Sequence, residues 1–387
     1  MSFRTAALLL AGCSLCGPAC GGESMFTPPP QLVGELGDYR SPLLFDDGRP
    51  VETPAQWEQR RREIRRAWDR LLGPWPAVIE RPNVETLGTS QRDGYEQRRV
   101  RFELAPDHPT EGYLLIPPGD APRPAALVVY YEPETAVGDG KPHRDFARQL
   151  ARRGFVTLSV GCQPSLYYPS REDAELQPLS ALAYGAANAY HVLAAQPEVD
   201  ADRVAVVGHS YGGKWALFAA CLYDKFAAGV WSDPGVVFDE SRPSVNYWEP
   251  WYLGYEPAPP PAEGANEPAA EVPPQHRRWG AGRARTASGP PTAENPAFGA
   301  YPELIRQGRD LHELHALMAP RPFLVSGGAE DPTERWRALN HSVAVNRLLG
   351  YENRVAMTNR PEHAPNEESN AQIAAFLERF LKPGAGD

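Results

Sequence analysis

Short apolar runs alternate with amphipathic stretches along most of this 387-residue chain. Apolar runs bounded by turn residues are typical of strands buried on both faces of a sheet, and apolar positions three and four apart are typical of the helices that cover it. Strands are expected at residues 102–104, 112–116, 125–131, 155–160, 204–207, 227–232, 322–326 and 355–358, and helices near 144–153, 179–195, 214–220 and 367–381. This alternation predicts an α/β fold with a mostly parallel central sheet and helices on both faces.

An amphipathic helix is expected before that core. Between Pro54 and Leu72, the apolar residues Trp57, Ile64 and Trp68 recur at helical spacing, with arginines on the other positions. A run of arginines can bind nucleic acid, but acidic residues interrupt this one and the whole chain has a net charge of −10. We therefore expect a solvated arginine face and no nucleic-acid partner. Residues 54–100 are interpreted as a helical extension ahead of a catalytic domain at 101–382.

A long insertion separates two of the expected core strands, at about residues 234–300. Its first part is aromatic, and residues 257–291 are rich in proline, alanine, glutamate and arginine, which predicts a mobile segment. The insertion has the position of a lid. Its aromatic residues would either pack on the core or contact a substrate, and Trp248 and Trp251 are the candidates for substrate contact.

The N-terminus resembles a lipoprotein signal. One positive charge and the apolar stretch 6–11 precede Leu10-Ala11-Gly12-Cys13, so residues 1–12 would be removed and Cys13 would carry lipid. Residues 13–53 would then form a flexible tether. The expected location is the periplasm or the outer membrane, with a cytoplasmic chain as the alternative. No run approaches the roughly 20 apolar residues of a membrane-spanning helix, so membrane contact would come only from the lipid.

The five cysteines do not form a metal-binding pattern. Cys13, Cys16 and Cys20 crowd the processed end, whereas Cys162 and Cys221 lie in core positions, and none has a suitably spaced histidine. We therefore expect no metal and no cofactor.

The strongest chemical signal is Gly208-His209-Ser210-Tyr211-Gly212. It follows the apolar run 204–207 and precedes a stretch of small and apolar residues with a helical pattern. A serine at such a strand-to-helix turn projects its Oγ above the sheet edge, and the flanking glycines let strand and helix approach each other. Ser210 is therefore the predicted nucleophile.

A nucleophilic serine needs a base and an acid that orients the base. His363 follows the last expected strand and is the predicted base, because His312, His315 and His341 lie in helical patterns and His209 lies inside the serine motif. The run 322–326 leads into Gly327-Gly328-Ala329-Glu330-Asp331, which would present an acid at the end of a strand. Asp331 is the predicted acid and Glu330 is the alternative.

Two further groups of residues are candidates for the site. The backbone amide of Tyr211, directly after the nucleophile, is the expected first oxyanion donor. The second is the amide of Glu132 after the strand at 125–131, because Pro133 has no N–H to donate. Lys214 lies close behind the nucleophile and could donate to sugar hydroxyls or to a uronate carboxylate.

These motifs resemble the α/β-hydrolase superfamily over about residues 101–381. Gly208, Ser210, Gly213 and Lys214 are similar to the G-C-S-R-x-G-K signature of glucuronoyl esterases, but the chain departs from it at His209 and Tyr211. The departure at Tyr211 matters because the arginine at that place in the family helps to stabilise the oxyanion.

The whole chain looks more like acetyl xylan esterases and dienelactone-hydrolase-like proteins. The motif G-x-S-Y-G-G is also frequent in the prolyl oligopeptidase group. That group usually has a β-propeller ahead of its catalytic domain, and about 100 N-terminal residues cannot build one.

The resemblance implies an exported serine esterase that removes acetyl or uronoyl groups from plant or microbial polysaccharide through a Ser-Asp-His triad and an acyl-enzyme. One alternative is a prolyl-oligopeptidase-like peptidase. The other is a lipid-anchored binding protein that keeps the fold without turnover, because a fold alone does not establish catalysis.

Overall fold

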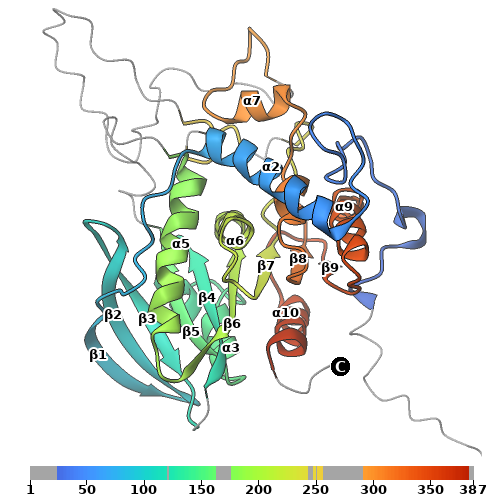
Figure 1. Ribbon diagram of the computed structural model, residues 1–387. Coiled ribbons are helices and arrows are strands. Elements are labelled where there is room, and N and C mark those ends of the chain that lie inside the picture. Colours follow the sequence, from blue (N-terminus) through green and yellow to red (C-terminus); the bar gives the residue numbers. More distant parts are fainter. Residues whose placement is uncertain are drawn as a thin grey trace, which may run out of the picture.

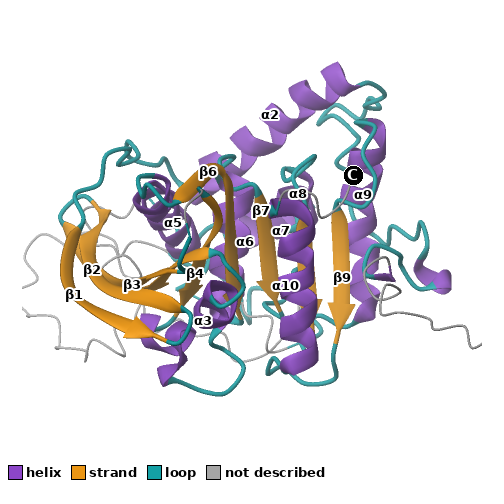
Figure 2. Cartoon of the chain, turned by 90° about the horizontal axis from the view of Figure 1, so that it is seen from below, coloured by secondary structure: helices purple, strands orange, loops and turns teal. Residues whose placement is uncertain are grey.

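A single nine-stranded sheet organises the chain, in the order β1-β2-β3-β5-β4-β6-β7-β8-β9 (Figure 1). The computed structural model describes residues 24–119, 122–162, 176–242, 247–249, 251–255 and 291–382. The strands are β1 (Glu85–Arg92), β2 (Tyr95–Ala105), β3 (His108–Ile116), β4 (Arg123–Tyr130), β5 (Val156–Gly161), β6 (Val199–His209), β7 (Ala228–Ser232), β8 (Phe323–Gly327) and β9 (Val355–Asn359). Strands β1, β2 and β3 pair antiparallel, β3 is antiparallel to β5, and the strands from β5 to β9 in sheet order are parallel. Figure 2 shows the curved antiparallel edge at β1 and the parallel edge at β9.

Helices cover both faces of this sheet, as the alternation of elements predicts. The described helices are α2 (Pro54–Leu72), α3 (Phe146–Ala151), α5 (Pro178–Ala194), α6 (Tyr211–Leu222), α7 (Tyr301–Arg306), α8 (His312–Ala316), α9 (Trp336–Leu348) and α10 (Glu367–Leu381), with short turns η1 (Pro30–Leu32), η2 (Thr135–Asp139) and η4 (Thr333–Arg335). Alternate residues of β4 face opposite sides, because side chains alternate along a strand. Leu127 and Val129 join the core under α2, α5, α6, α8 and α9, whereas Ala126 and Val128 join the core under α3 and α10.

The domain boundary expected at residue 101 is wrong, because it falls inside β2. The sheet begins at Glu85, and α2 belongs to the same core, with Trp57, Ile64 and Trp68 completely buried. The expected helical extension is therefore part of the domain.

The described part of the expected tether also packs on the domain. Leu32, Phe45 and Val51 are buried in the core on the α2 side. The carbonyl of Met25 accepts a hydrogen bond of 2.8 Å from the amide of Met357 in β9. These apolar residues are scattered without helical or strand periodicity, so their burial left no pattern in the sequence.

One arginine of α2 departs from the expected solvated face. Arg60 is fully buried, and its guanidinium pairs with Asp46 at 2.7 Å, Glu63 at 2.9 Å and Glu313 of α8 at 3.5 Å. A buried cation needs such partners to offset the loss of hydration. Arg60 therefore ties α2 and the N-terminal segment to α8.

Several expectations fall on residues outside the described part. These are the signal at 1–12, Cys13, and the segment 257–291 except for its last residue. Within the described ranges, no helix has the length and apolar character needed to cross a bilayer.

Candidate active site

Ser210 lies at the tight turn between β6 and α6, as predicted. Its backbone has φ 58° and ψ −122°, a conformation that costs about 1–3 kcal/mol in a residue other than glycine. A Cβ at Gly208 would lie 2.0 Å from the carbonyl oxygen of Gly212, and one at Gly212 would lie 2.2 Å from the carbonyl oxygen of Val129. The two glycines therefore permit the close approach that holds Ser210 at the carboxyl edge of the sheet.

Ser210 and His363 meet, as the sequence predicts. His363 lies in the loop between β9 and α10, with its Nε2 2.9 Å from the Oγ of Ser210. Its Nδ1 lies 2.8 Å from Oδ2 of Asp233, the residue directly after β7. Asp233 is completely buried, whereas His363 is half-buried. This arrangement places serine, imidazole and carboxylate in one hydrogen-bonded chain, with the imidazole reachable from solvent.

The predicted pairing of Asp331 or Glu330 with the histidine is wrong. The carboxylate of Asp331 accepts hydrogen bonds from the backbone amides of Gly235, at 2.8 Å, and Val236, at 2.6 Å. Burial, and then the nearby Asp233 carboxylate, raise the pKa of Asp331 to about 6. Glu330 points to Arg242 at 3.8 Å.

The turn after β8 holds the Asp233 carboxylate and does not itself supply the carboxylate that contacts His363. The amides of Asp331 and Glu330 donate to Oδ1 of Asp233 at 2.8 and 3.1 Å. A Cβ at Gly328 would lie 2.6 Å from Oδ2 of Asp233, so this glycine makes room for the carboxylate. Asp233 follows β7 and Asp331 follows β8, and these two strands are adjacent and parallel. Both acids therefore lie near the carboxyl ends of the strands, so the pattern of strands in the sequence did not distinguish them. The available signal was that Asp233 ends the strand next to the one that carries the serine.

Arg360 is a second residue that the sequence reading missed. It is 5% exposed, and its Nη1 donates to the carbonyls of Ser326 at 2.8 Å and Gly327 at 3.1 Å. Its Nη2 donates to the carbonyl of His363 at 2.7 Å, and its Nε to that of Ala364 at 2.8 Å. Burial lowers the pKa of this guanidinium. Arg360 thus fastens the loop that carries His363 to the end of β8.

Arg360→Lys is expected to lower kcat by about 10²-fold with little change in KM, because a displacement of about 1 Å at a catalytic group costs that much. Lysine keeps the charge but loses the planar fork that reaches both loops. Steady-state kinetics on an ester substrate measure the effect, and Arg354→Lys, at the opposite end of β9, is the matched control. A kcat that is unchanged in a folded Arg360→Lys protein would show that His363 is positioned without it.

The two residues expected at the oxyanion site lie beside Ser210. Tyr211 is the first residue of α6, and Glu132 follows β4. Ser210 and Glu132 line one cavity of about 440 Å³, together with Tyr130, Tyr131, Thr135, Gly140, Lys141 and Arg144. The ring of Tyr211 stacks on Tyr131 at 5.5 Å and on Tyr252 at 4.8 Å, so it is fixed under this cavity.

Lys214 does not contact the cavity, contrary to expectation. It is 5% exposed, its Nζ donates to the carbonyl of Pro234, and it lies over the rings of Tyr247 and Tyr252 at 4.7 and 5.4 Å. Burial lowers its pKa to about 8. Lys214 therefore supports the loop that follows Asp233.

Trp248 and Trp251 are half-buried against the core, and neither lines the Ser210 cavity. The carbonyl of Trp251 accepts a hydrogen bond of 2.9 Å from the Tyr211 hydroxyl. Of the two roles left open for these aromatics, the described contacts favour packing.

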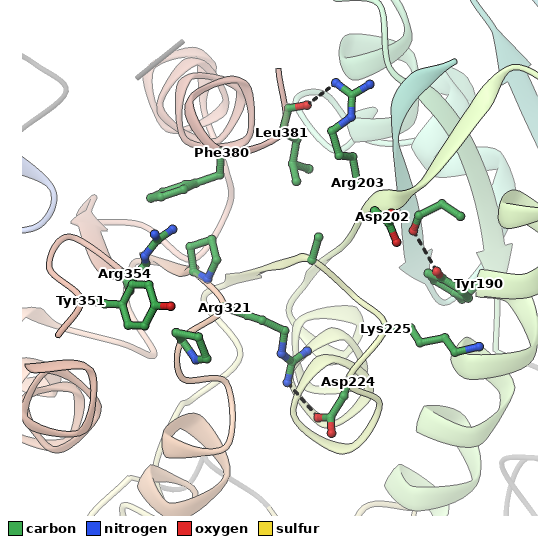
Figure 3. Close-up of a pocket in the computed structure, with 14 residues that line it drawn as sticks. Tyr190, Asp202, Arg203, Asp224, Lys225, Arg321, Tyr351, Arg354, Phe380 and Leu381 are labelled. Carbon is green, nitrogen blue, oxygen red and sulfur yellow. Dashed lines mark hydrogen bonds and ion pairs between the residues drawn. The ribbon is translucent and has the colours of Figure 1, made fainter. Parts of the chain in front are cut away.

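A larger cavity, of about 730 Å³, lies at the amino ends of the parallel strands, away from Ser210 (Figure 3). It is bordered by the residues that precede or begin β6 to β9, among them Arg203, Arg321 and Arg354. Arg203 pairs with Asp200 at 2.7 Å and Arg321 with Asp224 at 3.2 Å. Ligands of parallel sheets bind at the carboxyl ends of the strands, so the smaller cavity with Ser210 is the candidate active site.

Known proteins share this architecture. A glucuronoyl esterase from Solibacter usitatus superposes with a TM-score of 0.64 and 18% identity, covering 88% of this chain and 97% of its own. A Bacteroides fragilis protein assigned as an acetyl xylan esterase superposes with a TM-score of 0.54 and 14% sequence identity. The superposition covers 91% of this chain and 100% of that protein. A glucuronoyl esterase from Sporotrichum thermophile was solved in complex with methyl 4-O-methyl-β-D-glucopyranuronate. It superposes with a TM-score of 0.53 and 17% sequence identity, covering 91% of this chain and 89% of its own.

The sequence comparisons are narrower. The prolyl oligopeptidase family matches residues 186–271, which include Ser210 and Asp233. No curated protein matches the sequence significantly. Together with the sheet order and the serine turn, the structural neighbours show that the chain has the α/β-hydrolase fold predicted from its sequence.

Proposed function

We propose that this protein is a serine esterase that hydrolyses carboxylic esters on carbohydrates, with Ser210 as nucleophile, His363 as base and Asp233 as acid. The observation that carries the proposal is the hydrogen-bonded chain from Ser210 Oγ through His363 to Asp233, at 2.9 and 2.8 Å. Nucleophile, base and orienting acid in such contact are the requirement for acyl transfer.

The reaction follows from this geometry. His363 Nε2 takes the proton from Ser210 Oγ as the oxygen attacks the ester carbonyl, while Asp233 holds Nδ1–H and stabilises the imidazolium. The backbone amides of Tyr211 and Glu132 would donate to the oxyanion. His363 then protonates the leaving alkoxide, leaving an acyl group on Ser210. Water, deprotonated by His363, then attacks the acyl carbonyl. The bond to Ser210 Oγ breaks, His363 returns the proton to this oxygen, and the carboxylic acid leaves.

The carbohydrate part of the proposal is supported by the fold neighbours, which are glucuronoyl esterases and a protein assigned as an acetyl xylan esterase. The substrate of this chain would be an acetyl or a uronoyl ester. Because Tyr211 replaces the arginine of the glucuronoyl esterase motif, the acetyl ester is the first candidate.

A peptidase is the second candidate, favoured by the match of residues 186–271 to the prolyl oligopeptidase family. Against it, the described residues ahead of β3 form η1, α2 and the strands β1 and β2 of the central sheet, and none of them belongs to a β-propeller.

A substrate panel tests the proposal. The purified protein is expected to hydrolyse acetylated xylooligosaccharides or methyl glucuronoyl esters, and to leave a proline-containing peptide intact. A fluorophosphonate probe should label the wild type and not Ser210→Ala, because the probe reacts with an activated serine. Cleavage of the peptide in preference to every ester would transfer the assignment to the peptidase. Absence of labelling in the folded protein would leave a binding protein on a hydrolase fold.

A further inference from the structure

Two positive charges line the cavity that holds Ser210. These are Lys141 and Arg144, which belong to the segment between η2 and α3. Ser210 belongs to the turn between β6 and α6, so the charges and the serine come from different parts of the chain. Glu132 is the one carboxylate among the described residues that line it. One of its oxygens accepts a hydrogen bond from the Thr135 hydroxyl. The described lining thus has a net positive charge in a protein whose overall net charge is −10.

Tyr130 holds Arg144 in the cavity wall. The Nη1 of Arg144 donates to the Tyr130 hydroxyl at 2.8 Å, and the Cζ of Arg144 lies 5.8 Å from the centre of the Tyr130 ring. Within the described ranges, no carboxylate forms an ion pair with Arg144 or Lys141. The nearest acid along the chain, Asp145, accepts from Arg148 at 2.8 Å and from Gln149 at 2.7 Å. Among the residues that the structure describes, no acid therefore neutralises the charge of Arg144.

This contrasts with the neighbouring arginines. Arg148 pairs with Asp145, and Arg152 pairs with Asp93 at 3.3 Å. Arg144 alone of these three faces the Ser210 cavity. A guanidinium has five N–H donors in a planar fork that matches a carboxylate, and the Tyr130 hydroxyl occupies one of them.

We propose that Arg144, assisted by Lys141, binds a carboxylate of the substrate, so that the protein selects ester-bearing sugars that also carry a free acid group. This inference rests on the proposed esterase function and names its substrate class: acetylated acidic oligosaccharides. The fork of Arg144 receives the carboxylate in the cavity that it lines with Ser210, and the exposed Lys141 adds attraction that salt screens. The neutral ester carbonyl then faces Ser210.

A matched pair of substrates tests the charge directly. An acetylated galacturonide and the corresponding acetylated galactoside differ only in carrying a carboxylate or a hydroxymethyl group. The wild type is expected to prefer the galacturonide by about 10- to 100-fold in kcat/KM, since charge-assisted hydrogen bonds contribute on that scale. Arg144→Gln should remove most of this preference, with a far smaller loss on the galactoside, and Arg144→Lys should keep part of it.

Two other variants sharpen the result. Glu132→Gln removes the one negative charge of the lining and should raise the preference for the galacturonide by a few-fold. Arg148→Gln is the matched control, because Arg148 is paired outside the cavity, and it should leave the preference unchanged. An equal loss on both substrates in Arg144→Gln would assign Arg144 to the oxyanion or to the fold and overturn the proposal, as would a wild type without preference.

Binding separates this inference from the proposed function. Calorimetry with Ser210→Ala and a galacturonide oligosaccharide should show binding that is lost in the Ser210→Ala/Arg144→Gln double variant. If the wild type hydrolyses no ester but this Arg144-dependent binding is present, the esterase proposal fails and the carboxylate site stands. If 4-nitrophenyl acetate is hydrolysed but the galacturonide binds equally with and without Arg144, the carboxylate site fails alone.

Discussion

Ser210→Ala and His363→Ala are each expected to lower kcat by about 10⁶-fold, because neither attack nor proton transfer proceeds without its partner. The contact of 2.9 Å between Ser210 Oγ and His363 Nε2 makes the two act as one unit. The double variant should therefore be no slower than either single one. Steady-state hydrolysis of 4-nitrophenyl acetate measures all three.

Correct folding has to be shown for the same proteins. Ser210→Ala should keep or raise the melting temperature, because a small residue remains at the strained turn and no core contact is lost. Additive losses in the double variant, or near-normal turnover in Ser210→Ala, would remove the triad from the mechanism.

Asp233→Asn is expected to lower kcat by about 10⁴-fold. An amide in place of the carboxylate allows the wrong imidazole tautomer and does not stabilise the imidazolium. The hydrogen bond of 2.8 Å that His363 Nδ1 donates to the Asp233 carboxylate identifies this residue, and the amides of Glu330 and Asp331 keep its carboxylate in place. The ratio of kcat values on one ester is the measurement.

Asp331→Asn is the matched comparison, and we expect it to change stability more than turnover. Because the pKa of Asp331 is raised to about 6 in the folded protein, above the ordinary aspartate value, its protonated form favours folding. This contribution is present below about pH 4 and is lost as the pH rises through about 6. The difference in unfolding free energy between wild type and Asp331→Asn should fall over that interval in urea titrations. A loss of turnover in Asp331→Asn greater than in Asp233→Asn would restore Asp331 as the acid.

The parallel core and the position of Ser210 could be predicted from the amino-acid sequence. Strands such as β4 and β8 are continuous apolar runs, and a strand buried on both faces leaves that pattern whatever its neighbours are. Ser210 was predictable because the turn needs glycines at 208 and 212: a Cβ at Gly208 would collide with the turn itself, and one at Gly212 with the adjacent strand β4. His363 was predictable because it follows the last strand, at the same edge of the sheet.

The carboxylate that contacts His363, and the residues that support it, depend on contacts between segments that are far apart along the chain. Asp233 and Asp331 end adjacent strands at one edge, and which of them meets His363 depends on side-chain direction across loops about 100 residues apart. The same holds for Arg360, whose partners are carbonyls that no sequence pattern marks, and for Lys214, whose burial depends on the tyrosines of the insertion packing over it. Periodicity and steric rules act over a few residues and can be read along the chain, whereas hydrogen-bond partners are set by elements that meet only after folding.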